Sequence, residues 1–278
     1  MNTMSEQSIK TTWGFFVTEI ESDALLFDCR SEDAYAASTI RGAYCAALIR
    51  KPHGSGPNSM LKLTGFVKSI QKIVTEEGSA KKKIVVFDEG MGMYAGKLAW
   101  LLKSVGLKNV FVLARRFNEI PQAQLVPGKE VIIEQEVKSP LTLKGIVPIS
   151  YVQTNLTRVQ LVDVRAPEEY DGLLPRLVSP EPGSRCGRIP GAVNYDWRRI
   201  YDIDGGVRSR MEIAREFRAA GLIPERPTIL YDYNGARSSM MAFLFQECNY
   251  RHVDVFLGSW MEWRKTRLPV QNSKIWNP

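Results

Sequence analysis

Residues 228–237 read TILYDYNGAR and pass from a short apolar stretch into a turn that contains Gly235. The first four residues are apolar or β-branched, a pattern typical of a buried parallel strand. A helical pattern follows over 238–248. A strand that enters a tight turn and then a helix points several backbone N–H groups at one place, where the helix dipole also favours negative charge. The stretch predicts one unit of an α/β fold, with an anion-attracting loop over 232–237.

The same pattern occurs earlier in the chain, about 140 residues upstream, where IVVFD at 84–88 matches TILYD at 228–232. Other segments repeat at a similar offset and in the same order, which indicates two copies of one domain. The matched segments are 25–30 with 161–165, 40–43 with 189–192, and 109–113 with 253–257.

Each copy alternates short apolar strands with helical patterns, so we expect an α/β fold with a central, mostly parallel sheet flanked by helices. Residues 136–149 include Pro140 and Pro148 and are the expected linker. The predicted domains are therefore 1–138 and 139–278. The expected helices are 94–105, which stops at Gly106, 211–220, which stops at Gly221, and 238–248.

The composition is that of a folded protein. The 278 residues are 44% hydrophobic and 24% charged, which excludes a disordered or low-complexity chain. No apolar run approaches the ~18 residues that a membrane span needs, and the first residues lack a secretory or mitochondrial pattern, so we expect a cytoplasmic protein without a membrane partner. The net charge of +7 favours anionic partners but does not predict nucleic-acid binding.

The cysteines and histidines are few. The four cysteines form no CxxC pair, which excludes a zinc ribbon and argues against a disulfide framework. With only two histidines, a His-based triad or a His-rich metal site is not expected. We therefore predict neither a metal nor an organic cofactor.

The chain resembles the rhodanese superfamily, and specifically its tandem-domain sulfurtransferases of the thiosulfate and 3-mercaptopyruvate types. The resemblance runs from about residue 12 to residue 270. In the second copy it rests on 161–165, 187–194, Trp197, 232–237 and the motif GSWMEW at 258–263. In the first copy it rests on 28–30, 40–43 and 87–90, followed by Ala95 and Trp100.

The resemblance implies a nucleophilic cysteine at the first position of the second loop, where a thiolate would accept sulfur and hold it as a persulfide. This chain has Asp232 there, and Asp88 at the equivalent position of the first copy, which in the family is non-catalytic. An aspartate cannot carry a persulfide. Its carboxylate would accept the loop N–H bonds itself, which lowers its pKa. We therefore expect sulfurtransferase activity to be absent or weak.

The resemblance also suggests the other site residues. The expected loop residues around an anion are Tyr233, Asn234, Gly235, Ala236 and Arg237. Arg185 resembles the family's substrate-binding arginine, and Trp260 is either a pocket residue or core packing. The expected partner is a small sulfur-containing anion or a protein, with the chain acting as a regulatory homologue.

Two other functions remain open. The first is an active sulfurtransferase that uses another thiol, for which Cys186 between Arg185 and Arg188 is the best candidate, although an incidental loop cysteine is the simpler interpretation. The second is a docking module, because residues 25–49 resemble the non-catalytic domain of MAP-kinase phosphatases and the lysine run 81–83 offers a basic patch.

The sequence also resembles three other kinds of site more weakly, and its residues fit each of them less well. The related cell-cycle phosphatases share the fold but use a loop one residue longer. Asp232-x-Asn234 faintly resembles a haloacid-dehalogenase start without its downstream partners. The run 202–206 resembles a calcium loop but lacks the later acidic ligands, so a plain turn is expected. Arg165 is expected to brace Asp163 rather than to contact substrate.

Overall fold

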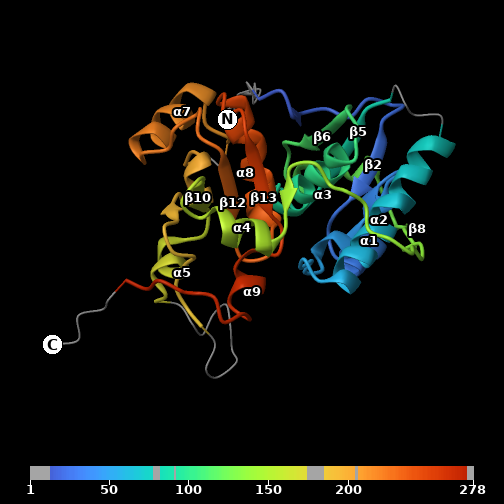
Figure 1. Ribbon diagram of the computed structural model, residues 1–278. Helices are drawn as coiled ribbons and strands as arrows, with labels where there is room; N and C mark the ends of the chain where they lie inside the picture. Colours follow the sequence, from blue (N-terminus) through green and yellow to red (C-terminus); the bar gives the residue numbers. More distant parts are fainter. Residues whose placement is uncertain (1–12, 78–81, 91, 174–184, 204–205, 274–278) are drawn as a thin grey trace, which may run out of the picture.

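The computed structural model describes residues 13–77, 82–90, 92–173, 185–203 and 206–273. Residues 1–12 at the start of the chain, Lys81 of the lysine run and residues 204–205 of the calcium-like run lie outside these residues. The described chain forms two α/β halves side by side, coloured blue to green and yellow to red in Figure 1.

The first half is built on a six-stranded sheet in which every neighbouring pair is parallel. Its order is β1 (Phe16–Val17), β6 (Val110–Leu113), β5 (Ile84–Phe87), β2 (Leu25–Asp28), β4 (Tyr44–Cys45) and β8 (Glu130–Val131). Its helices are α1 (Glu32–Ala37), α2 (Pro57–Glu76) and α3 (Met93–Ser104), with the 3-10 turns η1 (Ala47–Arg50), η2 (Phe117–Glu119) and η3 (Gln122–Gln124). A small antiparallel ribbon pairs β3 (Thr39–Ile40) with β7 (Leu125–Val126).

The second half repeats this sheet without the last strand, again with only parallel pairs. Its order is β9 (Ile146–Val147), β13 (Val253–Phe256), β12 (Thr228–Tyr231), β10 (Gln160–Asp163) and β11 (Val193–Asn194). Its helices are α4 (Ile149–Asn155), α5 (Pro167–Asp171), α7 (Arg210–Ala219), α8 (Ala236–Glu247) and α9 (Ser259–Trp263), with the 3-10 turn η4 (Trp197–Ile200). The matching strand orders confirm the predicted repeat and the α/β class.

The central strands β5 and β12 are buried along their whole length. Both faces of these strands pack against apolar residues, so the strands have no polar side, which explains their continuous apolar sequence. Each central strand leads into a loop and then a helix, α3 in the first half and α8 in the second. The two loops therefore lie at the carboxyl ends of the strands, the edge where ligands of open α/β sheets usually bind.

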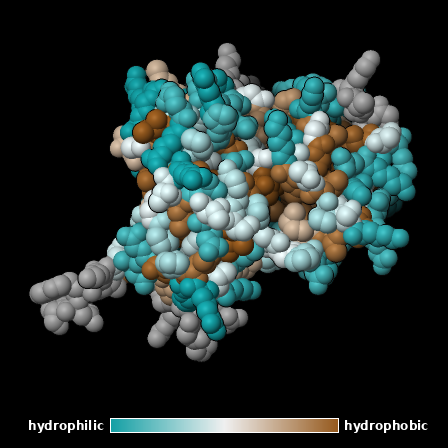
Figure 2. Space-filling model, viewed as in Figure 1, coloured by the Kyte–Doolittle hydropathy of each residue, from teal (hydrophilic) through white to brown (hydrophobic). Residues whose placement is uncertain are grey.

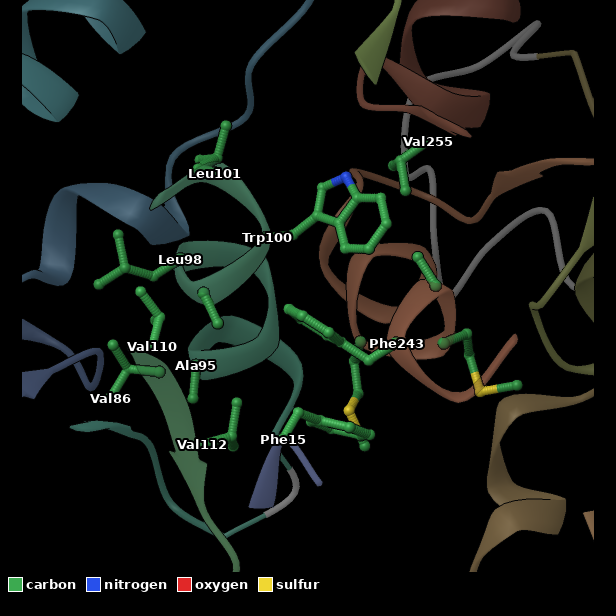
Figure 3. Close-up of a cluster of buried hydrophobic side chains, with 14 of the residues drawn as sticks. Phe15, Val86, Ala95, Leu98, Trp100, Leu101, Val110, Val112, Phe243 and Val255 are labelled. Atoms are coloured by element: carbon green, nitrogen blue, oxygen red, sulfur yellow. The ribbon is translucent and has the colours of Figure 1, made fainter. Parts of the chain in front are cut away.

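The two halves join through α3 and α8, which pack against each other. Gly96 allows the helices to approach closely, because a Cβ there would lie 2.7 Å from the Cβ of Met240. Figure 3 shows Trp100 of α3 and Phe243 of α8 turned toward each other, with ring centroids 5.1 Å apart. Phe15, from the start of the described chain, stacks on Phe243 at 4.8 Å. One apolar core therefore runs through both halves.

The contact between the two halves is also visible at the surface. Figure 2 shows hydrophobic side chains reaching the visible face near the middle of the molecule, where the halves meet, and hydrophilic ones around most of the rim. Within the described part of the chain, no helix combines the length and apolar character required to cross a membrane.

Candidate functional site

The loop after β12 carries Asp232 at its start and Gly235 at its end. Gly235 has a φ of +86° and precedes α8. A Cβ at this position would lie 2.6 Å from the backbone oxygen of Leu257, so both the conformation and the space require glycine. The turn is tight, and it directs the first N–H groups of α8 back toward Asp232.

The carboxylate of Asp232 occupies the centre of this loop, and the residue is 0% exposed. Oδ1 accepts hydrogen bonds from the Gly235 N–H at 2.7 Å and from the hydroxyls of Ser238 and Ser259 at 2.8 and 3.1 Å. Oδ2 accepts from the Arg237 N–H at 3.2 Å and faces Arg237 Nε at 3.4 Å. The donors that the sequence predicts for an anion are thus used by the protein's own side chain.

These contacts keep the carboxylate charged. Burial by itself raises the pKa of Asp232, but the Arg237 guanidinium and the hydrogen bonds from Ser238, Arg237 and Gly235 outweigh it and hold the pKa below its usual value. Asp232 therefore carries a negative charge at neutral pH. A second anion in the same place would meet electrostatic repulsion.

Arg237 is held between two carboxylates. Its Nη1 and Nη2 donate to Glu169 Oε2 and Oε1 at 2.8 and 3.2 Å, and its Nε faces Asp232. Burial lowers the pKa of Arg237, but the hydrogen bond to Glu169 and the charge of Asp232 leave it above its ordinary value. Glu169, from α5, escaped the sequence analysis, because only the tertiary fold brings it to this loop.

The motif at 258–263 closes the loop from the other side. Ser259 has a φ of +53°, and its hydroxyl reaches Asp232. The backbone N–H groups of Trp260 and Met261 donate to the carbonyls of Asp232 and Tyr233, both at 2.9 Å. The motif therefore fixes the backbone of the loop as well as its carboxylate.

Trp260 is 3% exposed, and the Arg165 guanidinium lies 4.8 Å from its ring centroid. Arg165 is buried and pairs with Asp163, its Nη2 lying 2.6 Å from Oδ2. The structure thus gives Arg165 the bracing contact that the sequence predicts, and gives Trp260 a place in the core. Whether Trp260 also contacts a substrate stays a prediction.

The outer face of the loop is only partly exposed to solvent. Tyr233, Asn234 and Arg237 are half-buried, whereas Gly235 and Ala236 are buried. The Asn234 side chain accepts from the Ala236 N–H at 3.4 Å. A partner that approaches this loop therefore meets an aromatic ring and an amide before it meets the carboxylate.

The first-domain loop has its own aspartate. Asp88 is 4% exposed and accepts four backbone N–H groups, those of Gly90 and Gly92 on Oδ1 and those of Tyr94 and Ala95 on Oδ2, at 2.9 to 3.2 Å. The two loops are alike in being filled by the aspartate that directly follows the central strand.

The Arg185 side chain contacts the backbone of the segment that follows α9. Its guanidinium donates to the backbone carbonyls of Thr266 and Leu268, and Nη1 lies 2.5 Å from the Thr266 oxygen. Cys186 is half-buried, and Cys29, Cys45 and Cys248 are buried and unpaired. The substrate-binding role of Arg185 and the nucleophilic role of Cys186 stay predictions.

A buried lysine of the first domain interacts electrostatically with Asp232. Lys97 of α3 is 0% exposed, and its Nζ donates to the Lys51 carbonyl at 3.3 Å. Burial lowers its pKa to about 8, partly opposed by the charge of Asp232. The signal available in the sequence was a lone lysine inside the apolar run 95–102, which we did not use.

A first-domain turn docks beside α9. The Ser55 N–H lies 3.0 Å from both carboxylate oxygens of Glu262, and the Ser55 hydroxyl donates to Oε2 at 3.0 Å. Because Glu262 belongs to the same motif as Ser259, this contact ties the first domain to the second loop. Among the described residues, no group of three or more histidine, cysteine or acidic side chains could hold a metal ion.

Comparison with known proteins places these features in a family. The family model for a rhodanese-like domain matches residues 16–123 and 150–266, one match in each half. A Mycobacterium tuberculosis (strain H37Rv) protein is 39% identical over 205 residues, which cover 70% of this chain and 73% of the relative. The thiosulfate sulfurtransferase of Pseudomonas aeruginosa is 27% identical over 247 residues, 87% of this chain and 88% of its own.

Solved structures agree on the fold. The structure titled "Crystal structure of YnjE" aligns with a TM-score of 0.69 at 18% identity, covering 91% of this chain and 63% of that chain. At this identity the likeness concerns the fold alone. With two matched domains and relatives that span most of its length, the chain belongs to the rhodanese family, as a tandem of two rhodanese-like domains related to the thiosulfate sulfurtransferases.

Proposed function

We propose that this protein is a sulfurtransferase homologue that lacks persulfide chemistry and acts by binding a partner. Asp232 takes the position at which the family's cysteine thiolate attacks the sulfane sulfur of thiosulfate, breaks its S–S bond and releases sulfite. A carboxylate oxygen cannot hold that sulfur as a persulfide. The observation that carries the proposal is the fully buried Asp232 carboxylate, which accepts the donors of its own loop.

The charge of the loop favours a protein over a small anion as the partner. Asp232 already neutralises the N–H groups and shares Arg237 with Glu169, so little positive charge is left for an external anion. Tyr233 and Asn234, on the half-exposed face, offer an aromatic surface and an amide to a protein. The second loop would then be a recognition surface.

The deciding experiment measures sulfur transfer from thiosulfate and from 3-mercaptopyruvate to cyanide, detected as thiocyanate. The unchanged protein is compared with Asp232→Cys and with Asp232→Asn. We expect no thiocyanate above background from the unchanged protein and from Asp232→Asn, and turnover from Asp232→Cys. Direct titration with thiosulfate should show binding to Asp232→Asn and none to the unchanged protein.

Thiocyanate production by the unchanged protein would overturn the proposal. The test of the other thiol is then Cys186→Ser, whose loss of activity would assign the reaction to Cys186. Tight thiosulfate binding to the unchanged protein, without thiocyanate formation, would support the lack of sulfur transfer. It would also show that the partner is a small sulfur-containing anion rather than a protein.

A further inference from the structure

A cavity of about 300 Å³ lies in the first domain, between the end of η1 and helix α2. Its size is at the lower end of the ~300–1,000 Å³ of small-molecule sites. Phe66, which is buried, and Leu48, which is half-buried, supply an apolar wall. Neither Asp88 nor Asp232 lines the cavity.

Three charged side chains line the same cavity. Lys51 and Lys62 are exposed and bring two positive charges, and the exposed Glu134 brings one negative charge. The charged side chains that line it therefore carry one net positive charge. This net positive charge attracts an anion, and the apolar wall accommodates an organic body, so a small carboxylate matches the lining.

The buried member of the lining is His53, which is 7% exposed. Its Nδ1 is buried and has no hydrogen-bond partner among the described residues. Burial, together with the charges of Lys97 and Lys51, lowers the pKa of His53 to about 3, so the imidazole is neutral at physiological pH. A buried polar atom without a partner is costly, and a bound group that supplies a partner offsets that cost.

We propose that this cavity binds a small organic monocarboxylate. Its apolar body lies against Phe66 and Leu48, its carboxylate lies between Lys51 and Lys62, and His53 gains a hydrogen-bond partner through a turn of its ring. A carboxylate fits better than a neutral molecule because the lysines and the nearby Lys97 make this part of the first domain positive. The site does not depend on what the loop of Asp232 does.

The test uses benzoate as the charged probe and benzamide as its neutral counterpart, titrated into the full-length protein. The chain has two histidines, His53 and His252, so the imidazole NMR signals give a residue-specific readout. We expect benzoate to shift the His53 signal in a saturable way and to leave that of the exposed His252 unchanged. Benzamide should bind at least about tenfold more weakly, since it lacks the charge that the lysines attract.

Variants at exposed positions keep the test independent of folding. Lys51→Gln combined with Lys62→Gln should weaken benzoate binding about tenfold, and Glu134→Gln should strengthen it about threefold. Lys72→Gln is the matched control, since Lys72 lies on the same helix as Lys62 and pairs with Glu76. It should leave the affinity unchanged.

Three results would overturn the proposal. They are the absence of a saturable His53 shift, equal binding of benzoate and benzamide, or an effect of Lys72→Gln as large as that of the double variant. A benzoate effect that disappears in Arg237→Gln but persists in the double lysine variant would place the anion at the second-domain loop instead. Failure of this proposal is distinguishable from failure of the proposed function, because benzoate binding and thiocyanate formation are measured separately.

Discussion

The two aspartate loops occupy equivalent places in the two domains but are built differently. Asp88 is held by four backbone N–H groups, which any loop of that shape would supply. Asp232 is held by two N–H groups and by the side chains of Ser238, Ser259 and Arg237. The first loop satisfies its carboxylate with the backbone alone, whereas the second uses donors from its own turn, from α8 and from Ser259 at the start of α9.

The difference lies in the side chains that the second loop adds to its backbone donors. Side-chain donors such as Ser259, which adopts a left-handed backbone conformation, and Arg237, which is tied to Glu169, are more than a stable turn requires. A framework of this kind stabilises negative charge on whatever stands at position 232. The second loop should therefore tolerate and use a thiolate, and the first should not.

The largest effect should come from Asp232→Cys, compared with Asp88→Cys. We expect Asp232→Cys to transfer sulfur from thiosulfate to cyanide at least about 100-fold faster than Asp88→Cys, because Arg237 and the hydroxyls lower the thiol pKa only in the second loop. Thiocyanate formation measures the rate, and alkylation rates at varied pH measure the thiol pKa. Equal activity of the two variants would mean that the backbone alone makes the site.

The next effect concerns the arginines beside the loops. Arg237→Ala leaves the buried carboxylate of Asp232 and the half-buried one of Glu169 without their cation and should lower the free energy of unfolding by about 3 kcal/mol. Arg50→Ala is the matched first-domain change, since Arg50 pairs with Glu89 at 2.9 Å on a partly exposed surface. It should cost at most about 1 kcal/mol.

Urea denaturation of both arginine variants gives the comparison. The midpoint of Arg237→Ala should fall well below that of Arg50→Ala, with similar slopes if both unfold in one step. Similar midpoints would show that the second loop does not depend on its arginine, and that Ser238 and Ser259 suffice to hold Asp232.

A smaller effect should come from the contact between the domains. Gly96→Ala places a Cβ 2.7 Å from the Cβ of Met240, so α3 and α8 must move apart, at a cost of about 2 kcal/mol. The control is Gly54→Ala at a different interdomain contact, where the nearest atom, of the flexible Glu262 side chain, lies 3.6 Å away. That variant should change the free energy of unfolding by at most about 0.5 kcal/mol. An equal loss of unfolding free energy in both variants would show that the α3–α8 contact is packed no more tightly than the contact at Gly54.

The sequence predicts the fold well because the apolar pattern within each short segment specifies its strand or helix. The expected helices 94–105 and 238–248 appear as Met93–Ser104 and Ala236–Glu247, shifted by one or two residues at their ends. The hydrogen bonds to Asp232 from its own loop were also predictable, since they join residues within six positions of each other.

The contacts that the sequence did not predict join distant parts of the chain. Glu169 reaches Arg237 across 68 residues. The charge of Lys97 interacts with Asp232 only because α3 packs on α8. Nothing in the local sequence of Arg185 indicates that its guanidinium turns to the carbonyls of Thr266 and Leu268. Partners that are distant in the sequence depend on tertiary packing, which patterns of spacing do not encode.

The smallest effect compares the single histidine of each domain. His53 has a folded-state pKa of about 3 against an ordinary value of 6.5, because it is buried near Lys97 and Lys51. Between these values the unfolded chain binds the proton and the folded protein does not, so stability falls as the pH drops below 6.5. From pH 7.5 to pH 5.5 the loss due to His53 is about 1 kcal/mol. His53→Gln should remove this part of the pH dependence, measured by urea denaturation at both pH values, whereas His252→Gln should follow the unchanged protein because His252 is exposed. If both variants kept the full slope, the protonation of His53 would be the same in the folded and unfolded states, and the first domain would not hold a neutral imidazole.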